Sequence, residues 1–485
     1  MTDIMRLRDI ILPALAVLAC QMILSSASCR KDPGRDPVVV PDKDKAAKEY
    51  LRDEYISVYY YWNSLVRDRN ASIATSEFDI YQYFDAMLYE KDRWSWMTDR
   101  EYYVSSETGV VSGTYGASLS QPIEYYGDYS VRVRYVYPDS PFYLAGVRRG
   151  WALTHIGGVD VMTLIRYDRF NDAYGASPQT FTFSDLEGVS HTFDLSAATS
   201  LNTHSSLMVK TFGPEDFPGL NEKVGYFNYL AFKANFLSDI TEAMEYLASE
   251  DVHTLILDLR YNGGGDSRAS QLLVDCLAPS FADGQVYVRR VHNEELASHN
   301  MEARVGESEP SLVRRLNLER LYVIVGAGSA SASEMVINGL RPMMDVKMVG
   351  DTTYGKPNGM YVLMYPGTNA DYAQYNKGNY DKLEWVFLPI CFYNQNGVGQ
   401  KIPDTGFIPD NYRPDDLYHD FDAGEDNIRA CLTHIATGLY PELPRLASGG
   451  TKAAGGLRIA LSEEERDPRY GLYTVREGAP LMSDF

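Results

Sequence analysis

Leu321-Tyr-Val-Ile-Val325 runs directly into Gly326-Ala-Gly-Ser-Ala-Ser-Ala-Ser-Glu334, and this stretch decides the fold that the sequence predicts. Its first part is a short apolar run rich in β-branched residues, which is typical of a buried strand. The residues from Glu334 to Leu340 are typical of the opening of a helix. The three serines therefore lie on a strand-to-helix turn, where free backbone N–H groups and the helix dipole favour developing negative charge.

A lysine follows the serine turn after a second predicted strand. Val346-Lys-Met-Val349 is an apolar run, and Gly350-Asp-Thr-Thr-Tyr-Gly355 leads from it to Lys356. A nucleophilic serine needs a base, and a lysine held away from water in its neutral form can serve. The alternative is a small-residue turn that caps an ordinary helix, with Ser331 or Ser333 as its N-cap.

The serine turn and the lysine together resemble a known family. Ser329-Ala-Ser-Ala-Ser-Glu334 and Tyr354-Gly-Lys356 are similar to the two marks of the C-terminal processing (tail-specific) serine proteases. The resemblance implies that Ser331 is the nucleophile and that Lys356 is its base, and their spacing is the usual one in that family. It implies no metal, nucleotide or other cofactor.

A glycine turn carries a second signature of this family. Thr254-Leu-Ile-Leu-Asp-Leu259 predicts a buried strand, and the signature runs from Asp258 to Gly265 as Asp-Leu-Arg-Tyr-Asn-Gly-Gly-Gly. Glycines let the backbone approach a substrate carbonyl, and their N–H groups can face an oxyanion. By resemblance, the N–H groups of Gly264, taken in preference to Gly263, and of Ala332 form the oxyanion hole.

The sequence departs from the family four residues after the lysine. Family members often have a glutamine there that orients the dyad, whereas this chain has Met360. A thioether cannot donate a hydrogen bond. Either Asn358 substitutes for the glutamine, or the enzyme works as a dyad.

The order of elements predicts an α/β fold. The predicted strand Val224–Leu230, the helix Ser238–Ala248 and the strand that follows form a βαβ unit with continuous apolar strands, which favours a mostly parallel sheet. The resemblance implies a ClpP/crotonase-like peptidase core and extends to Asp404-Thr-Gly-Phe-Ile-Pro-Asp410. Asp426–Leu439 predicts a closing helix.

The residues before this core predict two further parts. A helical region rich in aromatic residues is predicted up to Tyr103. Tyr135-Val-Tyr-Pro-Asp-Ser-Pro-Phe-Tyr-Leu-Ala-Gly-Val-Arg-Arg-Gly150 and Leu153-Thr-His-Ile-Gly-Gly158 resemble the middle of a PDZ domain. Such domains bind the C-terminal carboxylate of a peptide, and the matching loop is Thr114-Tyr-Gly-Ala-Ser-Leu119.

The N-terminal segment has the layout of a signal peptide. Arg6 and Arg8 precede an apolar run and small residues, and the pattern resembles a bacterial lipoprotein signal with lipidation at Cys29. Ser26 stands where that motif usually has Leu, and Cys20 is the alternative site. This predicts a lipid-anchored protein of the cell envelope, facing the periplasm or the cell surface, with plain secretion as the alternative.

These interpretations divide the chain into six parts. The boundaries are 1–28 for a signal peptide, 29–45 for a tether, 46–103 for the helical region, 104–198 for the PDZ-like domain, 199–445 for the catalytic domain, and 446–485 for a linker and tail.

The net charge of the chain excludes some classes of binding partner. The net charge of −21 argues against nucleic acid or an anionic membrane face as the main partner. No cysteine pair has metal-ligand spacing. The family and PDZ resemblances together imply a serine endopeptidase that hydrolyses cell-envelope or extracellular proteins recognised through their C-termini. The alternative is a weakly active or inactive surface lipoprotein that binds peptides or glycans.

Overall fold

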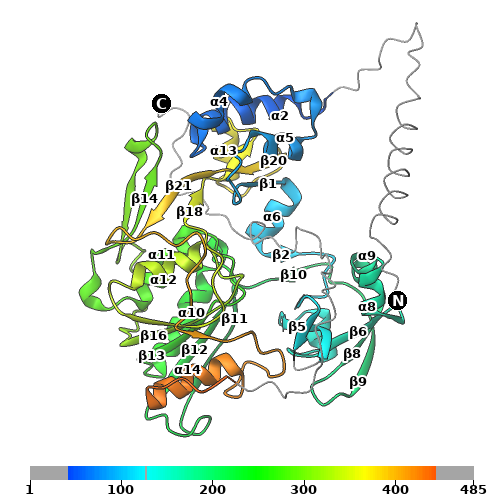
Figure 1. Cartoon of the computed structure of the whole chain (residues 1–485), viewed down its shortest axis with the longest axis vertical. Helices are drawn as coiled ribbons and strands as arrows, with labels where there is room; N and C mark the ends of the chain where they lie inside the picture. Colours follow the sequence, from blue (N-terminus) through cyan, green and yellow to red (C-terminus); the bar gives the residue numbers. More distant parts are fainter. Residues whose placement is uncertain (1–41, 126–127, 444–485) are drawn as a thin grey trace, which may run out of the picture. The chain divides into compact units, whose positions relative to one another are not determined.

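The computed structural model describes residues 42–125 and 128–443 (Figure 1). The chain divides into two compact units, Met1–Lys43 and Asp44–Phe485, and the described helices and strands lie in the second. The predicted signal peptide, Cys20, Cys29, most of the tether and the predicted linker and tail lie outside the described residues.

A six-stranded sheet forms the centre of the α/β core (Figure 1). Its order is β11 (Ser206–Phe212), β12 (Val224–Tyr229), β13 (Thr254–Asp258), β16 (Arg320–Val325), β17 (Asp345–Gly350) and β22 (Asn411–Tyr412). Neighbours from β12 to β22 pair in parallel, and β11 pairs antiparallel at one edge. The predictions of a mixed α/β fold and of a mostly parallel sheet are confirmed.

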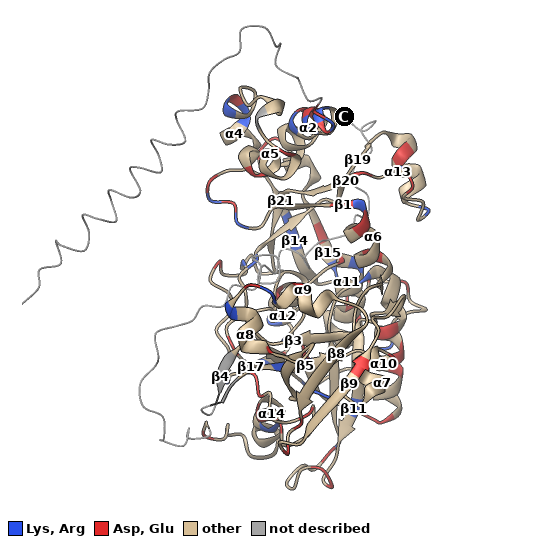
Figure 2. Ribbon diagram, turned by 90° about the vertical axis from the view of Figure 1, so that its right-hand side faces the viewer, with Lys and Arg blue, Asp and Glu red and all other residues tan. Residues whose placement is uncertain are grey.

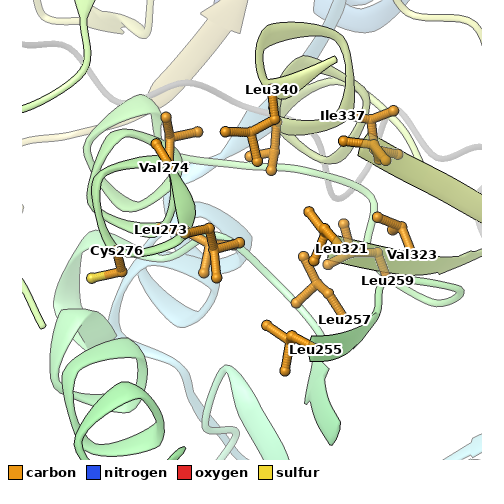
Figure 3. Packing of buried hydrophobic residues seen from close by; sticks show 14 of the residues in the cluster. Leu255, Leu257, Leu259, Leu273, Val274, Cys276, Leu321, Val323, Ile337 and Leu340 are labelled. Atoms are coloured by element: carbon orange, nitrogen blue, oxygen red, sulfur yellow. The ribbon is translucent and has the colours of Figure 1, made fainter. Parts of the chain in front are cut away.

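Helices cover both faces of this sheet. The helices of one face are α10 (Leu237–Ser249), α11 (Ser267–Leu277) and α12 (Ala332–Leu340). Figure 3 shows Leu257 and Leu321 of the strands pointing toward Leu273 of α11 and Leu340 of α12. Alternate strand residues such as Ile256 face the other way and pack in a second cluster with α14 (Asp426–Thr437). Burial on both faces explains the continuous apolar runs of the strands.

The closing helix ends two residues earlier than predicted. Gly438 follows α14 with φ +75°, a left-handed conformation that glycine adopts without steric cost. Leu439 is consequently exposed rather than packed as the last residue of the helix.

A β-rich module precedes the core. Its elements are β3 (Ala117–Leu119), β4 (Ile123–Tyr125), β5 (Asp128–Val136), α7 (Pro141–Ala145), β6 (Ala152–Ile156), β7 (Val159–Asp160), α8 (Val161–Arg166), α9 (Phe170–Gly175), β8 (Gln179–Ser184) and β9 (Ser190–Leu195). The main path of the sheet is β3-β5-β6-β8-β9, and the module has its own buried cluster, which includes Val133, Phe142 and Phe181.

The N-terminal helices share their core with strands from late in the chain. The helices are α2 (Lys45–Tyr50), a π-helix (Leu51–Ile56), α3 (Ser57–Tyr59), α4 (Asn63–Asn70), α5 (Ile80–Met87) and α6 (Arg100–Thr108). Tyr55 and Phe84 both pack against Phe387, so the predicted aromatic faces are buried, but against strands predicted as part of the catalytic domain.

Two small sheets carry those strands. One has the order β1 (Trp96–Asp99), β20 (Trp385–Leu388), β19 (Leu363–Tyr365), and the other β15 (Met301–Arg304), β14 (Val286–His292), β21 (Ile390–Gln395), β18 (Asn358–Met360). Helix α13 (Asn369–Tyr375) lies between β19 and β20, and β2 (Val110–Val111) pairs with β10 (Leu201–Asn202).

Charged residues of both signs are spread over many elements (Figure 2). Within the described part of the chain, no helix has the length and apolar character needed to cross a membrane.

Candidate active site

Ser331 differs from its neighbouring serines in conformation and bonding. The Ser329 hydroxyl donates to the Leu259 carbonyl at 2.7 Å, and the Ser333 hydroxyl donates to the Asn262 carbonyl at 2.8 Å. Ser331 precedes the first residue of α12 and has φ +53°, which is rare for a non-glycine residue. Such strain is retained where the surrounding structure enforces it, often at functional sites.

The Glu334 carboxylate joins the serine turn to the lysine segment. Oε2 accepts the N–H groups of Ser331 at 3.0 Å and of Lys356 at 2.8 Å. Oε1 accepts the Gly355 N–H at 2.8 Å and the Thr353 hydroxyl at 2.6 Å. Burial raises the pKa of Glu334, and these four hydrogen bonds act in the opposite direction.

This carboxylate brings the two predicted catalytic residues side by side, because both donate to the same oxygen atom. A further bond, from the Tyr354 N–H to the Ser329 carbonyl at 2.9 Å, ties the same two segments. The Lys356 side chain is buried, and Nζ donates to Met360 Sδ at 3.6 Å. A serine hydroxyl and a buried amine in neighbouring segments are a pair that can act as nucleophile and base.

The lysine segment is held from its other side by the stretch that begins at Asp404. Gly355 has φ +84°, and a Cβ there would lie 2.3 Å from the Asp404 carbonyl oxygen. The Thr353 N–H donates to the Phe407 carbonyl at 3.1 Å, and Trp94 Nε1 donates to the Gly355 carbonyl at 3.3 Å. Only glycine fits at Gly355, which explains why it precedes the lysine.

The two predicted oxyanion donors differ in their bonding. Among the hydrogen bonds of residues 42–125 and 128–443, none uses the Ala332 N–H. The Gly264 N–H donates to Asn262 Oδ1 at 2.9 Å, so it cannot bind an oxyanion without releasing Asn262. The neighbouring Gly263 is partly exposed, and its N–H has no acceptor within the described structure.

Asn262 ties the glycine turn to the serine turn. Its side-chain Nδ2 donates to the Tyr229 carbonyl at 2.8 Å, and its own carbonyl accepts the Ala330 N–H at 3.2 Å in addition to the Ser333 hydroxyl. The side chain is fully buried. Neither Asn262 nor Glu334 was predicted from the sequence to have a role in the site. The spacing of Glu334, three residues after the helix-capping serine, is that of a capping box and could have identified it.

The Asn358 amide forms no hydrogen bond to Lys356 in the described part of the chain. Both polar atoms of its amide are buried and have no hydrogen-bond partner within the described residues. The position beside the lysine Nζ is taken by Met360, which accepts the contact described above. The proposed substitution of Asn358 for the family glutamine is therefore not what this structure shows.

A cavity of about 350 Å³ borders the loop that leads to Ser331. Gly326, Ala327 and Gly328 form one wall, and Ser118 and Tyr135 of the β-rich module form part of another. The cavity therefore lies between the module and the carboxyl end of β16.

Ion pairs connect the module to the core beside this cavity. Arg149, in the module, pairs with Asp415 at 2.8 Å, and Arg260 pairs with Asp415 at 3.0 Å and with the fully buried Glu425 at 2.5 Å. Arg260 also precedes the glycine turn, so the network fixes that turn relative to the module.

No cluster of histidine, cysteine or acidic side chains that could hold a metal ion occurs among the described residues. Cys276, Cys391 and Cys431 are buried free thiols, and burial raises the pKa of each.

Comparisons with known proteins converge on this region. Residues 223–377 match the model of peptidase family S41. Carboxyl-terminal-processing peptidase 3, chloroplastic, of Arabidopsis thaliana is 32% identical over 137 residues, which are 28% of this chain and 24% of that protein. The C-terminal processing peptidase, chloroplastic, of Tetradesmus obliquus is 25% identical over 239 residues, which cover 45% of this chain and 46% of that one.

The fold is shared with a solved structure. The crystal structure of a putative S41 protease from Bacteroides fragilis NCTC 9343 aligns with 83% of this chain and 99% of its own, with a TM-score of 0.62 and 20% identity. In sequence, the chain spans about a quarter to a half of the length of the two relatives above. The comparisons therefore support peptidase family S41 for the part of the chain that contains Ser331 and Lys356.

Proposed function

We propose that this protein is a serine endopeptidase of the C-terminal processing type, with Ser331 as nucleophile and Lys356 as general base. The observation that carries the proposal is the shared acceptor: the N–H groups of both residues donate to Glu334 Oε2. The alternative is that the serine turn only caps a helix. It does not explain why the backbone of a buried lysine is hydrogen-bonded to the capping glutamate. The similarity to carboxyl-terminal-processing peptidases supports the same reaction class.

The proposed reaction proceeds in two halves. Ser331 Oγ forms a bond to the carbonyl carbon of the scissile peptide while its proton passes to Lys356 Nζ. The C–N bond then breaks, and the lysine gives the proton to the leaving amine. A water molecule then attacks the acyl-enzyme and gives a proton to Lys356 Nζ. The bond to Ser331 Oγ breaks, Oγ takes this proton from the lysine, and the new carboxylic acid is released as its carboxylate.

The oxyanion formed in each half needs preorganised donors. The Ala332 N–H is the first. We place the second at Gly263, because the Gly264 N–H predicted from the sequence is bonded to Asn262. Asn262 would then act by positioning the glycine turn against the serine turn.

The proposed substrate class is supported by the resemblance of the module to a PDZ domain and by the cavity. We propose that the protein cleaves extracellular or cell-envelope proteins that present a free C-terminus, recognised on the β-rich module at residues 114–119. The module shares a cavity wall with the loop before Ser331, which supports a path from this recognition site to the nucleophile. We further propose lipid anchoring at Cys29, on the sequence alone. Cys29→Ala should release the protein from membranes while Cys20→Ala should not, and membrane retention of Cys29→Ala would reject this assignment.

The test of the peptidase function is cleavage of a denatured model protein by the purified chain and by Ser331→Ala. The chain should cleave it, and Ser331→Ala should lose turnover completely. The matched control is Ser333→Ala, which changes a serine two residues away and should retain turnover. A serine-directed fluorophosphonate should label the parental chain at Ser331. Cleavage by Ser331→Ala at the parental rate would reject the proposal, and a folded chain that binds the substrate without cleaving it would indicate a binding protein.

A further inference from the structure

A second cavity, of about 420 Å³, lies between the β-rich module and the core on the side of helix α6. Its size falls within the range of about 300–1,000 Å³ that is usual for ligand sites. The module contributes the loop at Gly116 and the facing pair Ser118 and Tyr135, and the core contributes Thr203 and Lys233. Ser118 and Tyr135 also line the cavity beside the serine turn, so the two cavities adjoin.

The module turns a polar face toward this cavity. Ser118 of β3 lies opposite Tyr135 of β5, so the two side chains share one face of the sheet. The alternate residues of β3, Ala117 and Leu119, pack into the core of the module. The face that carries Ser118 and Tyr135 is thus the one directed away from that core, and both residues line the cavity.

Lys233 supplies the positive charge of the cavity. Its Nζ donates to the Thr203 carbonyl at 3.2 Å and to the Thr203 hydroxyl at 3.1 Å, and it forms no ion pair with any described carboxylate. Burial lowers its pKa to about 8, while the more distant Glu107 and Asp239 act in the opposite direction. This differs from the buried Arg149 and Arg260, each of which has acidic partners. A partly buried ammonium group that forms no ion pair with a described carboxylate gains from an anionic ligand.

In the loop predicted to bind a carboxylate, residues 114–119, Gly116 already forms hydrogen bonds within the module. The Gly116 N–H donates to the Thr114 hydroxyl at 3.0 Å, and the Gly116 carbonyl accepts the Tyr137 N–H at 2.8 Å. The Gly116 N–H is thus already used within the loop, and Lys233, which lines the same cavity, can supply a further donor to a carboxylate there.

Lys233 is also adjacent to the glycine turn. Phe232, one residue before it, donates its N–H to the Gly264 carbonyl at 2.9 Å, and its carbonyl accepts the Asp266 N–H at 2.7 Å. A Cβ on Gly265 would lie 2.1 Å from the Phe232 carbonyl oxygen. A ligand bound to Lys233 thus lies one residue from Phe232, which is hydrogen-bonded to the glycine turn.

We propose that Lys233 binds the carboxylate of a peptide substrate in this cavity, so that the core, and not only the β-rich module, recognises the substrate terminus. This inference rests on the proposed peptidase function and names the group that selects its substrate. The carboxylate can come from the α-carboxylate of the terminal residue or from an acidic side chain, and the test separates these sources.

The test measures binding in the Ser331→Ala chain, so that turnover does not interfere. The probes are one fluorescent peptide with an apolar C-terminus in its free-acid and amide forms, and an amidated analogue that ends in Asp. The free acid should bind at least about tenfold more tightly than the apolar amide, as expected for a charge-assisted hydrogen bond in a buried site. Adding Lys233→Met should remove this difference, whereas adding Lys377→Met, at an exposed lysine, should retain it.

Each outcome decides a point. Tight binding of the amidated Asp peptide that is lost in Lys233→Met assigns the site to a side-chain carboxylate and supports the inference. Equal binding of the free acid, the apolar amide and the amidated Asp peptide by the Ser331→Ala chain overturns it. A full acid preference in Lys233→Met also overturns it and returns recognition to residues 114–119. Failure of the parental chain to cleave any denatured protein would instead reject the peptidase function.

A folding control accompanies the binding data. Lys233→Met and Lys233→Gln both remove a charge without an ion-pair partner and lose the hydrogen bonds to Thr203, so the melting temperature should fall only a few degrees below that of Ser331→Ala. If Lys233→Met does not fold, Lys233→Gln decides by the same comparison of acid and amide.

Discussion

Two sets of acidic side chains adjoin the candidate site: the buried Glu334, and the buried Glu425 with the partly exposed Asp415. They are stabilised in opposite ways. Glu334 has four N–H and O–H donors and, within the described residues, no ion pair. Asp415 and Glu425 instead face two guanidinium groups. Burial raises the pKa of Glu334. Burial would also raise that of Asp415, but Arg149 and Arg260 outweigh it and hold its pKa well below its usual range.

The two kinds of carboxylate therefore have different roles: one positions the catalytic residues, and the other attaches the β-rich module to the core. A carboxylate that accepts backbone N–H groups fixes the path of the main chain to within a hydrogen-bond length, here on both sides of the dyad. A carboxylate paired with arginines joins segments through side chains, here the β-rich module and the core. Loss of the Glu334 hydrogen bonds should lower kcat, and loss of the ion pairs of Asp415 and Glu425 should lower the free energy of unfolding.

Outside the dyad itself, the largest expected effect is that of Glu334→Gln. A glutamine has one acceptor oxygen, and in either orientation its NH₂ group would face at least one backbone N–H donor, so the contact between the serine turn and the lysine segment should loosen. Displacement of catalytic groups by about 1 Å can cost about 100-fold in rate. We expect kcat for a peptide substrate to fall by at least that factor. Glu319→Gln, at an exposed glutamate, is the control. Turnover near the parental value in Glu334→Gln would contradict the positioning role.

Arg149→Met should reverse this pattern. Breaking a buried ion pair costs about 3–5 kcal/mol, and we expect about 3 kcal/mol here because Arg260 still pairs with Asp415 and Glu425. Denaturant unfolding monitored by circular dichroism measures this loss. The remaining folded protein should keep kcat within severalfold of the parental value. Unchanged stability would mean that the network does not hold the module.

The same network predicts a pH dependence. The folded-state pKa of Asp415 is lowered, so its contribution to stability is present above the unfolded value of about 4 and is lost as the pH falls below it. The difference in melting temperature between the parental chain and Arg149→Met should therefore shrink on going from pH 7 to pH 3. A constant difference would show that Asp415 is not the partner that matters.

The sequence predicted the strands of the central sheet because burial on both faces leaves continuous apolar runs. It did not predict that Tyr55 and Phe84 would pack on Phe387, because an aromatic period identifies a buried face and not its partner. The occupation of the Gly264 N–H by Asn262 and the contact of Met360 with Lys356 depend on side-chain orientation, which motif spacing does not specify.

The smallest expected effect is that of Ser333→Ala. Its hydroxyl bonds only to the Asn262 carbonyl, so we expect a loss of about 1 kcal/mol in stability and turnover within about threefold of the parental value. A complete loss of turnover in a folded Ser333→Ala protein would contradict the assignment of Ser331 as the nucleophile.

Replacement of the base tests the central claim most directly. Lys356→Arg retains a long cationic side chain, but arginine does not give up its proton, so it cannot accept one from Ser331. The measurement is hydrolysis of a denatured protein substrate by Lys356→Arg, with folding verified by circular dichroism and with Lys377→Arg as the control. The dyad predicts no turnover for Lys356→Arg and parental turnover for Lys377→Arg. Substantial hydrolysis by folded Lys356→Arg would contradict the assignment of Lys356 as the general base.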